Sequence, residues 1–189
     1  TVGSAAASLA DFNDDGVLDL VYGGGQGQFV VAFGLGNGSF HSERIFSASS
    51  PNYFSIIIPC DLNEDGLTDL VLAKFPTIQH VVMLNRGHGT FWSALYSPEH
   101  FLQYTMDMKI GHLNDDNHLD MAIIHFHKKT MKIHMGFGNG SFAAALDVPL
   151  PVNSYPSTLE MKDFNGDHRP DLLTSPFSGD EFVVILNDC

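Results

Sequence analysis

Four short aspartate-rich segments hold the residues of this sequence that could do chemistry. Their shared pattern is Asp-x-Asn-x-Asp-Gly-x-x-Asp, and they span residues 11–19, 61–69, 112–120 and 163–171. The pattern offers side-chain oxygens at loop positions one, three, five and nine and a backbone carbonyl at position seven. Oxygen ligands in a flexible loop are those that Ca²⁺ prefers. The spacing therefore predicts four calcium-type loops, which we number one to four along the chain.

The loops differ from EF-hands, which begin in the same way. An EF-hand needs a bidentate Glu at position twelve and a helix on each side, whereas position twelve here is Tyr22 or Leu72, inside an apolar run. The aspartate at position nine is predicted to take over from that glutamate. We expect the calcium to have a structural role, because no pair of mobile helices exists to report binding.

The charge balance agrees with a cation partner. The chain has 22 acidic and 9 basic residues and a formal net charge of −13. The four loops hold 14 of the 22 acids, and such clusters repel themselves unless something positive lies among them. The same balance argues against nucleic acid or an anionic membrane surface as a partner.

The loops are registered copies within a longer repeat. They start 50, 51 and 51 residues apart, and each is surrounded by short apolar runs bounded by Gly, Asn, Asp and Pro, which is typical of strands. For the first repeat we predict strands at about residues 6–10, 18–22, 29–33 and 39–46. Four antiparallel strands at this period predict an all-β fold, a β-propeller built of four-stranded blades.

We therefore interpret residues 1–189 as a single β-propeller segment of four blades, at about residues 1–49, 50–100, 101–152 and 153–189. The last blade ends before its outer strand. This predicts part of a larger propeller or an array completed by another chain, because blades must stack to bury both faces of each sheet.

The repeats resemble the FG-GAP/VCBS repeats of integrin alpha-chain propellers and related secreted proteins. The matching residues are the loop Asp11 to Asp19 with its copies, the Asp-Leu-Val run after it, and the segments Phe33-Gly-Leu-Gly-Asn-Gly-Ser-Phe40 and Gly136-Phe-Gly-Asn-Gly-Ser-Phe142. The resemblance covers essentially the whole chain and is specific for the fold and the calcium site, but not for a ligand.

The resemblance implies two complete calcium sites. The side-chain ligands in loops one and two would be Asp11, Asn13, Asp15, Asp19 and Asp61, Asn63, Asp65, Asp69, with carbonyls from Val17 and Leu67. Loop four keeps Asp163, Asn165, Asp167 and Asp171, with Arg169 at the carbonyl position, but places His168 where the glycine belongs; we expect it still to bind. Histidine or asparagine can adopt the left-handed conformation needed there at some cost.

Loop three departs further from the pattern. It keeps Asn114, Asp116 and Asp120 but has His112 in place of the first aspartate and Asn117 in place of the glycine. Neutral imidazole is a poor ligand for a hard ion. Calcium in loop three should therefore be weak or absent.

Two turns carry glycosylation sequons, at Asn37-Gly-Ser39 and Asn139-Gly-Ser141. The same residues also suit a tight hairpin, so both interpretations stay open. Strand alternation predicts that these turns and the calcium loops share one face of the propeller.

We place ligand binding on the opposite face, where Tyr53, Phe75, Phe101 and Phe177 offer aromatic side chains. The partner would be a protein or a glycan. The pair His125-x-His127 has a spacing compatible with a transition metal, but strand-edge histidines explain it as well.

Other features limit the functional class. No motif for a catalytic nucleophile, a phosphate loop or a zinc protease is present, so we expect no enzyme. Two cysteines, Cys60 and Cys189, are too few for a disulfide framework, and both a pair and a buried free thiol at Cys60 remain open. No apolar stretch approaches the length of a membrane span.

The sequence thus predicts a secreted or cell-surface interaction module stabilised by calcium. Two alternatives remain: a structural subunit that assembles edge to edge in a matrix or filament, and an accessory or lectin propeller of a larger secreted enzyme.

Overall fold

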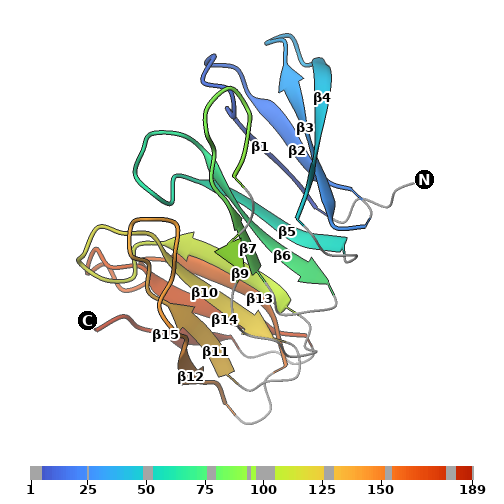
Figure 1. The fold of residues 1–189 in the computed structure, drawn as a ribbon. Helices are drawn as coiled ribbons and strands as arrows, with labels where there is room; N and C mark the ends of the chain where they lie inside the picture. Colours follow the sequence, from blue (N-terminus) through green and yellow to red (C-terminus); the bar gives the residue numbers. More distant parts are fainter. Residues whose placement is uncertain are drawn as a thin grey trace. The chain divides into compact units, whose positions relative to one another are not determined.

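The computed structural model describes residues 6–24, 26–48, 53–75, 80–92, 95–96, 105–125, 130–151, 155–177 and 182–188. All regular structure in these ranges is β-strand, as predicted (Figure 1). They contain no helix with the length and apolarity that crossing a membrane would require.

The strands form four antiparallel sheets, one for each predicted blade. Blade one has the order β1-β2-β3-β4, blade two β5-β6-β7-β8, blade three β12-β11-β10-β9 and blade four β13-β14-β15. The bounds are β1 Ala7–Ala10, β2 Asp19–Gly23, β3 Gln28–Gly34, β4 Phe40–Ser47, β5 Tyr53–Cys60, β6 Asp69–Phe75, β7 His80–Met83, β8 Leu95–Tyr96, β9 Thr105–Gly111, β10 Asp120–His125, β11 Thr130–His134, β12 Leu146–Pro149, β13 Pro156–Lys162, β14 Asp171–Pro176 and β15 Val183–Ile185.

The predicted strands of blade one match the observed ones to within one residue or two. Each aspartate-rich loop connects the first and second strands of its blade, and each position-nine aspartate is the first residue of the second strand. The described part of blade four has three strands, which agrees with the missing outer strand that the sequence predicts.

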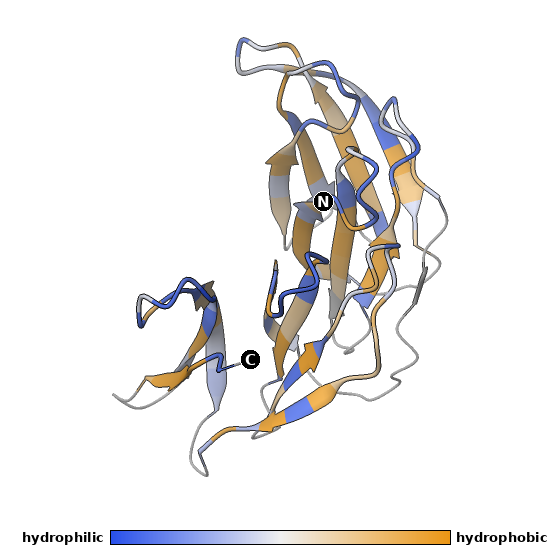
Figure 2. Ribbon diagram, turned by 90° about the vertical axis from the view of Figure 1, so that its left-hand side faces the viewer, coloured by the Kyte–Doolittle hydropathy of each residue, from blue (hydrophilic) through white to orange (hydrophobic). Residues whose placement is uncertain are grey.

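The chain divides into two compact units, residues 1–102 and 103–189, each with two blades. Within the first unit β5 packs against β1 and β2, and within the second β13 packs against β9 and β10. Figure 2 shows that most of the hydrophobic residues lie on the strands and that hydrophilic residues are concentrated in the loops.

Aromatic side chains join the two blades of the first unit. Phe29 and Phe46 of blade one stack with ring centroids 5.1 Å apart, and Phe91 of blade two meets them edge-on at 5.7 and 5.2 Å. Phe12, from loop one, lies 6.0 Å from the same ring. Edge-to-face arrangements are favourable for aromatic rings, so this cluster fixes the angle between the sheets as well as burying their surface.

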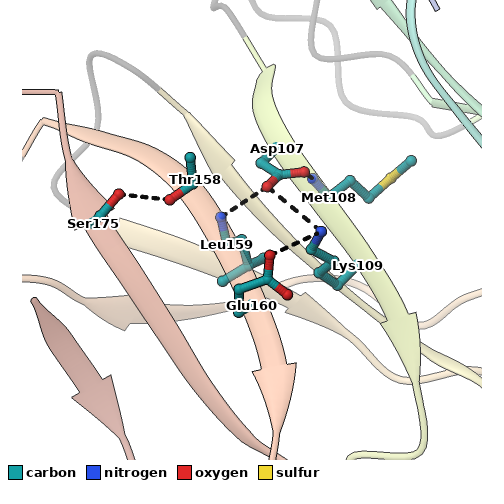
Figure 3. A network of polar contacts seen from close by, with 7 residues as sticks. All are labelled: Asp107, Met108, Lys109, Thr158, Leu159, Glu160 and Ser175. Atoms are coloured by element: carbon teal, nitrogen blue, oxygen red, sulfur yellow. Dashed lines mark hydrogen bonds and ion pairs between the residues drawn. The ribbon is translucent and has the colours of Figure 1, made fainter.

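The second unit uses aliphatic side chains at the matching positions. Met131 and Val148 lie where blade one has Phe29 and Phe46, and the core also contains Leu113, Ile124, Leu159 and Leu172. Polar contacts between β9 and β13 add to this packing (Figure 3). The Asp107 carboxylate accepts a hydrogen bond from the Leu159 backbone N–H at 2.8 Å, and Lys109 bridges Asp107 and Glu160 at 3.8 and 3.7 Å.

In the second blade of each unit, an asparagine side chain donates a hydrogen bond to the loop of the preceding blade. The side-chain amide of Asn85 donates to the backbone oxygens of Phe12 and Thr68, both at 3.0 Å, and Asn187 donates in the same way to Leu113 and Pro170 at 2.8 and 3.3 Å. The first blades have Gly34 and Gly136 at the corresponding position.

Those two glycines have no room for a side chain. A Cβ at Gly34 would collide with the backbone oxygen of Leu18, and one at Gly136 with that of Leu119. The position therefore alternates Gly, Asn, Gly, Asn, and the structural repeat is a pair of blades rather than a single blade.

Candidate calcium-loop site

The position-nine aspartates join all four loops to their sheets through hydrogen bonds. Asp19, Asp69, Asp120 and Asp171 are fully buried. Each carboxylate accepts one hydrogen bond from a backbone N–H of its own loop and one from a backbone N–H at the end of the third strand. For Asp19 these donors are Phe12 and Gly34, at 2.9 and 2.8 Å. The corresponding donors are Leu62 and Asn85 for Asp69, Leu113 and Gly136 for Asp120, and Phe164 and Asn187 for Asp171. Buried carboxylates need such donors, since an unpaired one would be very costly.

The position-one aspartates organise the loop backbone. In loop one Asp11 accepts hydrogen bonds from the backbone N–H groups of Asp14 and Gly16, both at 2.7 Å, and more distant ones from Asn13 and Asp15. Asp61 accepts from Asp65 and Gly66, and Asp163 from Gly166 and His168. These carboxylates are therefore held in place before any ion binds.

Positions three, five and seven repeat one geometry in every loop. The position-three amide donates to the position-five carboxylate at 2.9 Å, as in Asn13 to Asp15, Asn63 to Asp65, Asn114 to Asp116 and Asn165 to Asp167. The position-seven backbone N–H donates to that same carboxylate, from Val17, Leu67, His118 and Arg169. Hydrogen bonds thus join positions three, five and seven in each loop, and position one to positions five and six in loops one and two; a role of these residues as calcium ligands stays a prediction.

Left-handed backbone closes the loops. Gly16 and Gly66 at position six have φ values of 79° and 83°, and His168 and Asn117 adopt 71° and 66° at the same position. Position four is also left-handed in three loops, at Asp14, Glu64 and Gly166. The sequence predicted the first requirement but not the second.

Loop three is closed by a different contact. Nδ1 of His112 donates a hydrogen bond to the backbone oxygen of His118 at 3.0 Å. That oxygen stands at position seven, where the pattern places a calcium ligand. The imidazole N–H of His112 thus already pairs with the oxygen that a calcium ion in this loop would need.

The donor set of loop two fits a hard cation. Oδ1 of Asn63 is buried and has no hydrogen-bond partner, and it lies at a position where the pattern needs an oxygen ligand. Asparagine and carbonyl oxygens complete the set alongside the carboxylates. Within the described ranges no three His, Cys, Asp or Glu side chains converge on one point. Any ion in these loops therefore depends on amide and backbone oxygens as well as on the carboxylates.

Backbone hydrogen bonds lower the pKa values of the loop carboxyl groups, whereas burial raises them. Burial raises the pKa of Asp11, but hydrogen bonds from Gly16, Asp14, Asp15 and Asn13 outweigh it, so this pKa lies below its usual value. The backbone N–H of Gly166 lowers the pKa of Asp163, and that of His118 lowers the pKa of Asp116. At Asp69 burial prevails and raises the pKa to about 6. A bound cation would relieve that cost.

The sequon turn of blade one lies at the same end of the blade as its calcium loop, as predicted. Gly16, Val17 and Leu18 of loop one and Gly36, Gly38 and Ser39 of the turn line one shallow cavity of about 390 Å³. Asn37 and Asn139 are exposed, and each side-chain oxygen accepts a hydrogen bond from the hydroxyl of the sequon serine at 2.6 Å. Glycosylation of either residue stays a prediction.

The predicted ligand face falls partly outside the described residues. Tyr53 and Phe177 are exposed, whereas Phe101 and the Phe75 side chain are not described. His127 and Cys189 also lie outside those ranges, so neither the paired histidines nor a Cys60–Cys189 bond is tested. Cys60 is partly buried and has no disulfide partner within the described ranges.

Sequence reasoning missed the double anchoring by the position-nine aspartates and the binding of loops by Asn85 and Asn187. A signal for the second did exist, because Leu84-Asn85 and Leu186-Asn187 recur 102 residues apart, as do Phe33-Gly34 and Met135-Gly136. Self-comparison at twice the blade length would have found it.

Comparison with known families agrees with this geometry. The FG-GAP-like repeat family matches residues 11–72 and 112–174, about two thirds of the chain. This chain belongs to the FG-GAP-like repeat family. Each match begins at the loop of a first blade and ends within the second strand of the blade that follows. The two matches thus start 101 residues apart, and each lies within one two-blade unit.

The FG-GAP chain shares its fold with solved propellers. An Agrocybe aegerita lectin, described in terms of its recognition of non-reducing terminal N-acetylglucosamine, superposes with a TM-score of 0.65 at 18% identity, over 99% of this chain and 50% of the lectin. The Tc holotoxin pore of Photorhabdus luminescens gives a TM-score of 0.56 at 16% identity, over 95% of this chain and 9% of the toxin chain. The FG-GAP chain thus spans half or less of the chains it resembles. A search of curated proteins gave no sequence match.

Proposed function

We propose that this FG-GAP chain is a non-catalytic, calcium-stabilised binding module that acts outside the cell on a protein or a glycan. The observation that carries the calcium part is the repeated loop geometry. Backbone N–H groups hold the position-one and position-nine carboxylates, and the Asn63 side-chain oxygen is buried without a hydrogen-bond partner at a position where the pattern needs an oxygen ligand. Loops one and two would bind most tightly and loop four more weakly.

Calcium in these loops would serve the fold. Each loop links the first two strands of its blade and is bound to the end of the third strand through a buried aspartate. An ion that gathers positions one, three, five and seven would rigidify this connection. It would also neutralise clustered carboxylates that otherwise repel each other.

The binding part rests on membership of the FG-GAP-like repeat family and on the fold shared with a lectin propeller. Both support a recognition module. An extracellular location fits the same comparisons, and it provides the high calcium concentration that weak loop sites need.

Calorimetry with and without calcium tests the first part. Titration of the chelated protein with Ca²⁺ should show two or three sites, and saturation should raise the Tm because calcium binds only the folded chain. An unchanged Tm together with no heat of binding would overturn the calcium proposal. Exposure of the labelled protein to a glycan array and to extracellular-matrix proteins tests the second part, and failure to bind either class would overturn it.

A second candidate function, assembly through blade faces, is favoured by one observation. Leu9 and Ile45 of blade one and Leu186 of blade four have exposed fractions of 53%, 65% and 49%. Apolar faces of this kind associate with further blades. Sedimentation at increasing protein concentration separates this candidate from a monomeric binding module, because only assembly predicts a rising molecular mass.

A further inference from the structure

A pocket lined by both polar and apolar groups lies beside loop one, within the first two-blade unit. It has a volume of about 420 Å³, in the range of small-molecule sites. Asn13 and Asp15 of loop one and Phe33 of β3 line it. The remaining lining residues are His41, Ser42 and Arg44 of β4 and His88 of blade two. Nothing in the repeat pattern predicts this combination.

Two residues that line the pocket have left-handed backbone conformations. β4 has a β-bulge opposite Ala32 and Phe33, and Ser42 is the extra residue, with φ of 46°. His88, on the facing turn, has φ of 54°. Non-glycine residues seldom adopt such angles, and bulges often redirect side chains at functional sites. Both strained residues line the same pocket.

Arg44 is fixed across the pocket. Its Nη1 donates to the backbone oxygens of His88 and Gly89 at 2.6 and 3.3 Å, and its guanidinium lies 5.1 Å from the Phe33 ring centroid. One nitrogen makes both bonds, so the other N–H groups of the fork remain to donate to a ligand. A held guanidinium loses little entropy when it binds.

Blade three shows that the fold does not need these side chains. Its register places Leu146 where blade one has Arg44, and the 102-residue offset of the repeat aligns Ala143 and Ala144, which precede β12, with His41 and Ser42. Blade three still forms its sheet, and it keeps Asn114 and Asp116 in its loop. The pocket residues are therefore an addition to blade one, not a requirement of the repeat.

We propose that this pocket binds a neutral saccharide. A sugar hydroxyl both donates and accepts, which matches a wall that offers acceptors on Asp15, donors on Arg44, and groups that do both on Ser42, His41 and His88. Asp15 opposes Arg44 in charge, and the chain carries a net −13, so an anionic ligand is disfavoured. The inference rests on the glycan form of the proposed function and places the binding site next to loop one, rather than on the opposite face where the sequence predicts it.

Histidine NMR tests the proposal on the full chain. The probes are N-acetylglucosamine, galactose and mannose as neutral sugars, with glucuronate as the anionic arm. At least one neutral sugar should produce saturable shifts in the ring signals of His41 and His88. Absence of any shift up to 50 mM, or shifts with glucuronate alone, would overturn the inference.

The double variant H41A/S42A copies blade three and should leave the fold intact. It should weaken sugar binding at least tenfold, whereas Ser47→Ala, in the same strand but outside the pocket, should bind as the wild type does. R44K keeps the charge without the planar fork, and should also weaken binding. Wild-type affinity in H41A/S42A with an unchanged Tm would show that the pocket is not the site.

The glycan array distinguishes a failure of the pocket inference from a failure of the proposed function. If wild type and H41A/S42A bind the same glycans equally, the pocket inference is wrong while the glycan-binding function stands. If the wild type binds no glycan, the pocket inference falls with the glycan form of the function, and protein binding remains as the tested alternative.

Discussion

At the scale of single residues, the contact made by His112 leads to a prediction about calcium stoichiometry. Its imidazole donates to the position-seven oxygen of loop three at 3.0 Å and takes the place of an ion. The variant H112D restores the first carboxylate and frees that oxygen. We therefore expect it to bind one more calcium than the wild type in calorimetry, with a larger gain in Tm.

The reverse change supplies the control. Asp61→His places an imidazole at position one of loop two and should remove one calcium from the stoichiometry. If H112D binds no additional ion although its circular dichroism is unchanged, the first aspartate does not decide whether these loops bind.

Cys60 gives a second prediction at this scale. Burial, with smaller contributions from the charges of Asp69 and Asp61, raises the pKa of its thiol to about 12. The thiolate is the reactive form, so almost none is present at pH 8. In a Cys189→Ser variant, Cys60 should react with iodoacetamide at least a hundredfold more slowly in the native protein than in 6 M guanidinium. Equal rates, measured by mass spectrometry, would contradict the burial of this side chain.

At the scale of elements, Asn85 connects the third strand of blade two to loop one. Replacing it with Ala removes hydrogen bonds to Phe12 and Thr68 and leaves the buried oxygen of Phe12 with the Gly89 N–H alone. The loss should lower the free energy of unfolding by about 1–3 kcal/mol. Urea denaturation measures this, with an unchanged m-value showing that the same surface is exposed.

Gly34 provides the matched test at the same position of blade one. Gly34→Ala should destabilise the protein because its Cβ meets the backbone oxygen of Leu18, and that strand end cannot move without breaking the bond between Gly34 and Asp19. If Asn85→Ala and Gly34→Ala both leave the unfolding midpoint unchanged, the alternation of Gly and Asn has no role in blade pairing.

The sequence predicts a structural element well where the local pattern determines it. It predicts an element less well where residues distant in the sequence determine it. Short apolar runs between turn residues located the strands, and the loop spacing placed Asp11, Asn13 and Asp15 together. The bulge at Ser42 and the anchoring of Asp19 by Gly34 depend on residues across the sheet, which no local pattern contains. The sequence did not predict the pocket for the same reason, because His88 contacts β4 only after the two blades pack together.

At the scale of the whole molecule, the two-blade unit is the natural building block. Each unit has its own core, which is rich in phenylalanine in residues 1–102 and aliphatic in residues 103–189. The family match, the Gly and Asn alternation and the sequons at Asn37 and Asn139 all repeat at this length. One fold thus tolerates two different cores, because what the repeat keeps constant is the loop and its buried aspartate.

The charge of the whole chain yields the last prediction. With 22 acidic and 9 basic residues, the folded chain brings carboxylates closer together than the unfolded chain does, and most of them gather in four loops. Salt screens this repulsion over about 10 Å at 0.1 M. In chelator, raising NaCl from 20 to 300 mM should therefore increase the Tm by several degrees. With saturating calcium the increase should be smaller, because bound ions already neutralise the loops. Differential scanning calorimetry distinguishes the two conditions, and an equal salt effect in both would mean that the loop carboxylates are not where the repulsion resides.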